Sequence, residues 1–230
     1  MPQGETHSWD DEYDVVVLGS GGAGLTAALT AAVAGATVGV FEKSATVGGT
    51  TAVSGGIAWI PAHNRAAGRE LTEQDALRYL RAQSFGSMDD PMVETFVRTG
   101  PSMLDFVEKY SGLRFEIADG FPDYQPELPG GQPCGGRSLS AAPFDLGQIG
   151  DWAARLTAFP ADWSNVGTDA ETRARLHAGI ERSGDLCVAG TALIAGLLKG
   201  LLDVGVTPCT DTRATELIVD DGTVTGVRIT

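Results

Sequence analysis

The sequence predicts an α/β fold in which helices cover a parallel sheet, and three observations near its start support this. Residues 14–18 form an apolar run rich in β-branched side chains, which is typical of a strand buried on both faces of a parallel sheet. A glycine-rich turn leads into a stretch of Ala and Leu, and residues 37–41 form a second apolar run. Strand, helix and strand in this order make a βαβ unit, the building block of a parallel sheet.

The turn after the first strand has the glycine spacing of a dinucleotide-binding site, and it reads Gly19, Ser20, Gly21, Gly22, Ala23, Gly24. In this pattern Gly19 permits the tight turn, Gly21 lets the backbone approach a pyrophosphate, and Gly24 lets the helix pack closely on the strand. We expect the helix over residues 24–34, with Gly35 as its C-cap. Its unpaired N-terminal N–H groups and its dipole would face the phosphates.

An acidic residue, Glu42, ends the second strand and is followed by Lys43. A carboxylate at this place can accept hydrogen bonds from the ribose hydroxyls of an adenosine. The same charge would repel a 2′-phosphate, so NADP is disfavoured. The strand, turn, helix, strand and acid together predict a Rossmann-like unit that holds a dinucleotide, and both Glu42 and Lys43 are candidate cofactor-binding residues.

A second group of glycines and hydroxyls lies within residues 47–57. Backbone N–H groups and small donors of this kind suit the flavin-side phosphate and ring of FAD, whereas an NAD fold usually continues into another βα unit. The alternative is a flexible surface loop. The residues expected at the cofactor are Gly48, Gly49, Thr50, Thr51, Ser54, Gly55, Gly56 and Ile57.

These residues resemble the opening of the fumarate reductase and succinate dehydrogenase flavoprotein superfamily, and the run 57–61 is most similar to 3-ketosteroid dehydrogenases. Further matches lie at 123–126, 129–131, 135–137 and 190–227. The resemblance implies an oxidoreductase with noncovalent FAD, because Thr50 and Thr51 stand where some relatives attach the flavin through a histidine. It implies α,β-dehydrogenation of a carbonyl compound, or the reverse reduction, with a 3-ketosteroid as the expected substrate and hydride transfer to the flavin N5.

The resemblance also implies roles for residues outside the glycine loops. In 3-ketosteroid dehydrogenases the segment corresponding to Tyr124 and Gln125 borders the active site and has two consecutive tyrosines, one of them catalytic. Tyr124 is therefore the candidate catalytic residue, with an anchoring role in a Pro-rich loop as the alternative. Gln125 stands at the catalytic position, and an amide cannot titrate, which favours a related carbonyl substrate. The backbone near Ala214 is expected to approach the adenine, and Arg137 to lie near the flavin or in a surface salt bridge.

Two other functions stay open at this stage. One is a fumarate-reductase-like flavoprotein acting on a small dicarboxylate, which needs several Arg and His residues around its substrate. The other is a non-catalytic FAD-binding fragment. The chain stops within or just after the second strand of a predicted hairpin, where family members continue into a substrate domain. We therefore expect the N-terminal part of an FAD-binding domain, without the downstream substrate domain and with an electron acceptor that the sequence does not identify.

The expected organisation is an acidic flexible tail at 1–12, the βαβ unit and glycine loop at 13–61, a helical region with an active-site loop at 62–185, and a helix with a hairpin at 186–230. Within these parts, helices are expected from a Thr72 cap to Ser84, from Asp90–Pro91 to a break at Gly100–Pro101, over 102–110 with Gly112 as C-cap, and over 192–202 up to Gly205. Residues 120–150 are expected to be irregular. Strands are expected over 206–210, 213–220 and 223–230.

Composition limits the partners and the compartment. The 230 residues carry a formal charge of −14, which would be repelled by nucleic acid and by anionic membranes. The uncharged run 15–41 is long enough to span a bilayer, but its glycine-packed turn fits the βαβ unit better. No basic leader precedes it, so a cytoplasmic location is expected.

The cysteines and histidines predict no metal site and no disulfide. Cys134, Cys187 and Cys209 are odd in number and widely spaced, without a Cys-x-x-Cys pair. The histidines lie in the tail, in a loop and in an Arg-rich stretch, where structural or surface roles are favoured; they are His7, His63 and His177.

Overall fold

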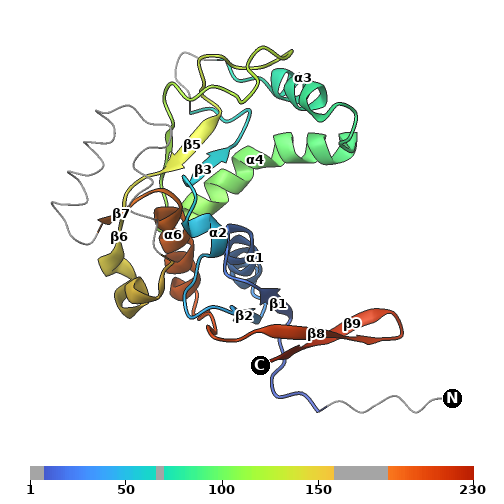
Figure 1. The fold of residues 1–230 in the computed structure, drawn as a ribbon, viewed down its shortest axis with the longest axis vertical. Coiled ribbons are helices and arrows are strands. Elements are labelled where there is room, and N and C mark those ends of the chain that lie inside the picture. Colours follow the sequence, from blue (N-terminus) through green and yellow to red (C-terminus); the bar gives the residue numbers. More distant parts are fainter. Residues whose placement is uncertain (1–7, 66–69, 158–185) are drawn as a thin grey trace.

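The computed structural model describes residues 8–65, 70–157 and 186–230. Two lobes are visible in Figure 1, with one helix, α6, at their junction. The lower lobe contains β1 (Val15–Leu18), α1 (Gly22–Val33), β2 (Val38–Phe41) and a hairpin of β8 (Ala214–Asp220) and β9 (Thr223–Ile229). The upper lobe contains β3 (Ile57–Trp59), α3 (Glu73–Ser84), α4 (Asp90–Tyr110), β4 (Phe115–Ile117) and β5 (Ser138–Ala141). Between them lie α2 (Gly49–Ala52) and α6 (Ala189–Asp203).

The βαβ unit is present as predicted. β1 pairs in parallel with β2, from Val15 opposite Val38 to Leu18 opposite Phe41, and the α/β fold class is confirmed. Gly35 follows α1 with a φ of +92°, as expected for the residue after a helix C-cap. The predicted strand at 206–210 is reduced to one parallel bridge, in which Cys209 donates to the Val40 carbonyl and accepts from the Glu42 N–H, both at 2.8 Å.

Helix α6 forms the centre of the main core, because it is buried on almost every side. It packs against α1, and two of its glycines meet the end of α4 and the segment that follows it. A Cβ on Gly196 would overlap the Leu113 side chain, and one on Gly200 would overlap the Tyr110 carbonyl. Glycine is therefore required here for close packing, although it weakens an isolated helix.

Helix α3 begins as predicted, with the Thr72 hydroxyl accepting from the Asp75 N–H at 3.0 Å. The predicted break at Gly100–Pro101 is wrong, because α4 runs through it. One buried stripe continues past the proline, and this packing outweighs the hydrogen bond that Pro101 cannot make. The stripe consists of Val93, Val97, Gly100, Leu104 and Val107.

The end of α4 also differs from the prediction. Ser111, in an extended conformation, is the C-cap. Gly112 has another reason to be glycine, because a Cβ there would lie 2.7 Å from the Phe144 ring. The residue is selected by tertiary packing, which a capping rule cannot detect.

The expectation of irregular structure over 120–150 holds only as far as Arg137. β5 follows and is the central strand of an antiparallel sheet, between β3 and β4. Fully buried Leu139 lies in this sheet. Further along are β6 (Phe144–Asp145), the 3₁₀ helix η1 (Leu146–Arg155) and β7 (Leu186–Cys187), which pairs with β6. These strands were missed because they are short and their partners are distant in sequence.

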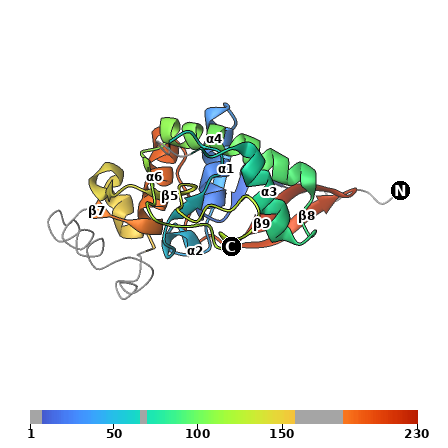
Figure 2. The ribbon, with the colours of Figure 1, turned by 90° about the horizontal axis from the view of Figure 1, so that it is seen from above.

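The predicted hairpin is present, with Asp221 and Gly222 at its turn. In Figures 1 and 2 it projects on the side opposite to η1 and β7. Trp9 of the predicted flexible tail lies against this hairpin, where a Cβ on Gly226 would overlap its ring. Residues 10–12 are exposed as expected, and residues 1–7 lie outside the described part of the chain, as does the Arg-rich stretch with His177.

We expect Pro101→Ala to stabilise the protein, because alanine restores a backbone donor in the middle of α4. The expected gain is about 1–3 kcal/mol in the free energy of unfolding, after allowing for the greater freedom of the unfolded chain. Pro91→Ala is the matched control, since Pro91 lies in the first turn of the same helix, where N–H groups have no helical partner. Urea unfolding at neutral pH measures both. An equal effect of the two substitutions would contradict the account of α4.

Candidate cofactor site and active-site loop

The first glycine turn has the close packing that its sequence predicts. Gly19 has a φ of +102°, a conformation that favours glycine. A Cβ on Gly24 would overlap the carbonyl oxygen of Gly19, so α1 approaches the end of β1 more closely than any side chain allows. The first N–H groups of α1 consequently face the space beyond the strand ends, where a phosphate can accept hydrogen bonds from them.

The hydroxyl of Ser20 connects the two strand ends to the second glycine loop. Ser20 is fully buried; its Oγ donates to Glu42 Oε2 at 2.5 Å and accepts from the Gly48 N–H at 3.1 Å. Its backbone N–H also donates to Glu42 Oε2, at 2.9 Å. The other carboxylate oxygen, Oε1, accepts from the Ser44 N–H at 2.9 Å. Since a carboxylate has about four lone-pair sites, Glu42 retains capacity for a ribose hydroxyl.

The glycine pair forms the start of α2, and both residues have left-handed backbones. The φ angles are +126° at Gly48 and +50° at Gly49. This turn places Thr51 across the start of α1, where its Oγ1 accepts from the Gly22 N–H at 3.1 Å. The hydroxyl proton of Thr51 can still be donated. This hydroxyl and the N-terminus of α1 therefore offer hydrogen-bond donors to the same space beyond the strand ends.

The end of this loop is held by the start of α6, a contact that sequence reasoning missed. The Ser54 carbonyl accepts from the Gly190 N–H at 2.9 Å, and a Cβ on Gly190 would overlap the Thr51 carbonyl. The hydroxyl of Ser54 stays within the loop, donating to the Thr51 carbonyl at 2.8 Å. The sequence signal for this contact was Gly190, which precedes the predicted helix at 192–202.

These contacts gather the predicted cofactor residues along one side of the strand ends, and the arrangement fits a long dinucleotide. The segment before Ala214 lies beside Glu42, because the Thr212 N–H donates to the Glu42 carbonyl at 2.8 Å. Exposed members of the predicted set, which have room for a ligand, are Ala23, Lys43, Gly49, Thr50, Gly55, Ile57 and Ala214. The buried members of the set are Ser20, Glu42, Gly48 and Gly56.

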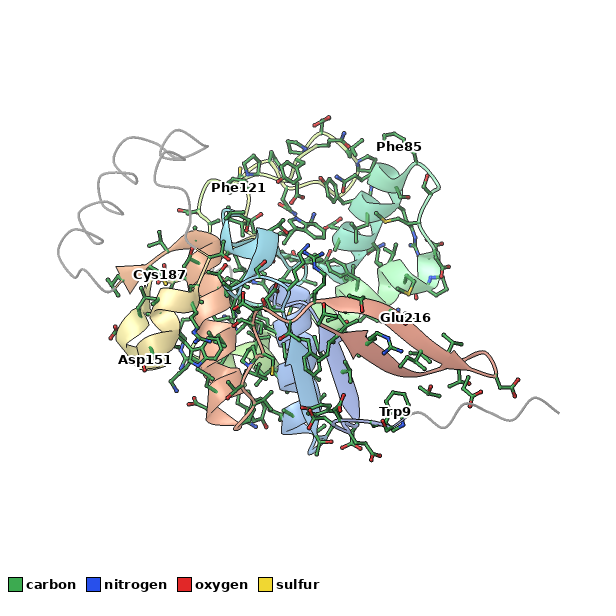
Figure 3. The ribbon with its side chains drawn as sticks, turned by 60° about the horizontal axis from the view of Figure 1, so that its bottom comes forward. Trp9, Phe85, Phe121, Asp151, Cys187 and Glu216 are labelled. Carbon is green, nitrogen blue, oxygen red and sulfur yellow. The ribbon has the colours of Figure 1, made fainter. Side chains whose placement is uncertain are left out.

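Tyr124 lies apart from the glycine turn, on the loop that joins β4 to β5. Its side chain is 88% exposed, so it does not anchor the loop on any of the described residues. Figure 3 shows Phe121, near the start of this loop, on the same lobe as Phe85 at the end of α3 and away from Glu216 on the hairpin. The neighbouring Gln125 donates its backbone N–H to the Tyr79 hydroxyl at 3.3 Å.

Arg137, expected near the flavin or in a surface salt bridge, is fully buried. Its Nη1 donates to Asp123 Oδ2 at 2.8 Å, and both side chains are at most 1% exposed. Its guanidinium carbon lies 5.7 Å from the Trp59 ring centroid and 5.8 Å from that of Tyr79. The sequence did not predict this cluster. It shows the order Asp–Tyr–Gln and the glycines before Arg137, but it does not show that these segments meet Trp59 and Tyr79.

His63 has the structural role that was favoured. It is buried, its Nε2 lies 2.7 Å from the Gly136 carbonyl, and its Nδ1 accepts from the Arg65 N–H at 3.1 Å. This pattern corresponds to a neutral ring that donates from Nε2, and burial lowers the pKa of His63. The histidine thus joins the loop after β3 to the glycines before β5.

The cysteines are all free, and burial raises the pKa of Cys187 to about 11. Across residues 8–65, 70–157 and 186–230, no group of three or more His, Cys, Asp and Glu side chains is arranged to hold a metal. Within the same ranges, no helix has the length and apolar character needed to cross a membrane.

Glu42 gives the site a testable dependence on pH. Burial by itself raises the pKa of this carboxyl, but hydrogen bonds from Ser20 and Ser44 outweigh burial, so the pKa lies below its ordinary value of 4.5. Ionised Glu42 therefore contributes stability that is fully present above about pH 4.5 and is lost as the pH falls through the folded-state pKa.

We expect Glu42→Gln to lower the free energy of unfolding at pH 7, with a smaller difference from the wild type below pH 4.5. Urea titrations at several pH values measure this difference. Glu116→Gln, at an exposed position of β4, controls for the loss of one negative charge. A Glu42→Gln difference that stays constant from pH 7 to pH 3 would show that the carboxylate is not stabilised in this way.

Comparison with known proteins agrees with this geometry. Residues 14–230 match the FAD binding domain family. The chain is 40% identical to 4-oxocyclohexanecarboxylate 2-dehydrogenase of Sinomonas cyclohexanicum, covering 94% of the chain and 40% of that protein. It is 36% identical to 3-oxosteroid 1-dehydrogenase of Mycolicibacterium smegmatis, covering 95% and 42%.

Among solved structures, the fold matches 3-ketosteroid delta1-dehydrogenase from Sterolibacterium denitrificans in complex with 1,4-androstadiene-3,17-dione. The TM-score is 0.84 at 28% identity, over 94% of this chain and 44% of that one. The chain therefore spans less than half the length of each of these relatives. The predicted resemblance to flavoproteins close to 3-ketosteroid dehydrogenases is confirmed, and the chain belongs to the FAD binding domain family.

Proposed function

We propose that this protein is an FAD-dependent oxidoreductase that removes two hydrogens from adjacent carbons beside the carbonyl group of a cyclic ketone. The cradle at the ends of β1 and β2 carries the proposal, together with relatives that are dehydrogenases of cyclic ketones. FAD is bound noncovalently, with Thr50 and Thr51 beside it, in a protein that we expect to be cytoplasmic.

Each part of the cradle has a proposed partner on the cofactor. At the start of α1 the Ala23 N–H binds the pyrophosphate, together with the hydroxyl of Thr51, which accepts from the Gly22 N–H and still has a proton to donate. Glu42 accepts from the adenosine ribose, and the backbone at Ala214 lies along the adenine. The flavin-side half is bound by the second glycine loop, whose contributing residues are Gly48, Gly49, Thr50, Thr51, Ser54, Gly55, Gly56 and Ile57.

FAD supplies the acceptor for the hydride that leaves the substrate carbon. The described residues have the tasks of binding the cofactor and orienting the ketone. Tyr124, the candidate catalytic residue, has an exposed phenol that can donate a hydrogen bond to the ketone oxygen, where negative charge develops as the neighbouring proton is removed. Gln125 cannot exchange a proton, so its contribution is limited to binding.

A cyclic ketone is favoured over a small dicarboxylate, because two basic side chains near the loop are already engaged. Arg137 is buried in its pair with Asp123, and buried His63 is bonded to Gly136. Neither side chain is available to bind a carboxylate. Steroid and single-ring ketones share the reacting group, and a 3-ketosteroid is the substrate class that we propose first.

The visible spectrum of the purified chain with added FAD tests the proposal. We expect bound flavin that is bleached without oxygen by 4-androstene-3,17-dione or by 4-oxocyclohexanecarboxylate. Gly24→Ala, whose Cβ would overlap the Gly19 carbonyl, should abolish binding. Ser87→Ala, at an exposed position after α3 and outside the cradle, is the control and should leave binding unchanged.

Other results point to the alternatives. Bound flavin that neither ketone bleaches, but that fumarate reoxidises after chemical reduction, would support the dicarboxylate enzyme. Bound flavin that reacts with none of these compounds would support a non-catalytic FAD-binding fragment. Failure of the wild-type chain to bind FAD would overturn the proposed cradle.

A further inference from the structure

The loop that carries Tyr124 is closed at its neck by one residue, Asp123. The Asp123 N–H donates to the Gln132 carbonyl at 3.1 Å, and the Gln132 N–H donates back to Asp123 Oδ2 at 2.9 Å. Residues 124–131 lie between these two partners. Tyr124 follows Asp123 directly, so the backbone at the neck determines the position from which the Tyr124 side chain projects.

The carboxylate of Asp123 also attaches this neck to both neighbouring strands. Its Oδ1 accepts from the indole Nε1 of Trp59 at 2.7 Å, and its Oδ2 accepts from Arg137 Nη1 at 2.8 Å. Trp59 belongs to β3, which continues from the second glycine loop, and Arg137 immediately precedes β5. One buried carboxylate thus connects the Tyr124 loop to the strand that leaves the proposed flavin site.

Stability does not explain why this pair is buried. Arg137 Nε and Nη2 and the amide oxygen of Gln125 are buried without a hydrogen-bond partner among the described residues. A buried ion pair with incomplete hydrogen bonding is a poor source of stability, and well-packed apolar side chains of similar volume often replace one without loss. The pair does fix the orientation of the Asp123 carboxylate, and with it the loop neck, because hydrogen bonds constrain angles as well as distances.

The rest of the segment is held while Tyr124 is left free. A Cβ on Gly130 would overlap the Asp75 carbonyl of α3, so the loop lies directly against that helix. The backbone of Gln125 is bonded to buried Tyr79. The phenol of Tyr124 projects from the segment, and its side chain is 88% exposed.

We propose that Asp123, with Arg137 as its partner, is the positioning residue for Tyr124 in the oxidation of the ketone. This inference rests on the proposed function, because it assumes that Tyr124 meets the substrate. Asp123 itself touches neither substrate nor cofactor. It acts by holding the loop neck against Trp59 and thereby holds Tyr124 in place relative to the flavin site.

The main test removes both charges with the double substitution Asp123→Leu, Arg137→Met, because a single substitution would leave a buried unpaired charge. Cooperative unfolding establishes that the variant is folded. We expect backbone amides of residues 124–131 to exchange with deuterium about tenfold faster or more, while those of β1 and β2 are unchanged. Unchanged protection of 124–131 in the folded double variant would overturn the proposal.

A matched control removes an exposed pair of the same charge types. Arg228 Nε lies 3.0 Å from Glu216 Oε2 on the hairpin, with side chains 59% and 61% exposed. The double substitution Glu216→Leu, Arg228→Met should leave exchange at 124–131 unchanged. The single substitution Arg137→Lys retains the charge but loses the planar guanidinium group. The protection of residues 124–131 in this variant should therefore lie between that of the wild type and that of the Asp123→Leu, Arg137→Met variant.

A kinetic cycle distinguishes positioning from a general structural effect. The rate of flavin reduction by saturating 4-androstene-3,17-dione, per bound flavin, should fall about tenfold or more in the Asp123→Leu, Arg137→Met variant. Adding Tyr124→Phe should cause no further fall beyond that of Tyr124→Phe alone, since residues acting through one group are not additive. If the rate decreases caused by the two sets of substitutions multiply, the proposal is overturned.

A wild-type flavin that the ketone never reduces would refute the proposed function instead. The exchange result would still decide whether Asp123 holds the loop.

Discussion

The hydroxyl of Ser20 makes the contact on which the proposed cofactor site most depends. It donates to Glu42 at the end of β2 and accepts from Gly48 at the start of α2, and it does so from a fully buried position at the end of β1. Three segments separated in sequence are thereby brought together at the place where α1 begins. Without that hydroxyl, Glu42 and the Gly48 N–H would each lose a buried partner, which costs more than an average hydrogen bond contributes.

The second lobe is connected to this centre through the same loop. Thr51 faces α1, Ser54 is held by the start of α6, and the chain continues into β3. Trp59, at the end of β3, then bonds to Asp123 beside Tyr124. A short series of contacts, through α2 and β3, therefore leads from the proposed pyrophosphate site to the proposed catalytic tyrosine.

Local signals were sufficient to predict the βαβ unit, the Thr72 cap and the hairpin, because their determinants lie within a few residues of one another. The continuous α4 was not predicted, since the stripe that carries it past Pro101 is stabilised by tertiary packing. The partners of Arg137 and Ser54 could not be predicted for a related reason. Each contact joins residues far apart in the chain, and residue types alone do not indicate which distant groups meet.

The affinity of the chain for FAD after Ser20→Ala tests the central claim most directly. Ser87→Ala, at an exposed position after α3, is the matched control, and calorimetric titration measures both. Loss of the one hydroxyl bond to charged Glu42, worth about 1.5–3 kcal/mol, predicts an affinity roughly tenfold lower or weaker still for Ser20→Ala, and no change for Ser87→Ala. A folded Ser20→Ala variant that binds FAD as tightly as the wild type would contradict the account.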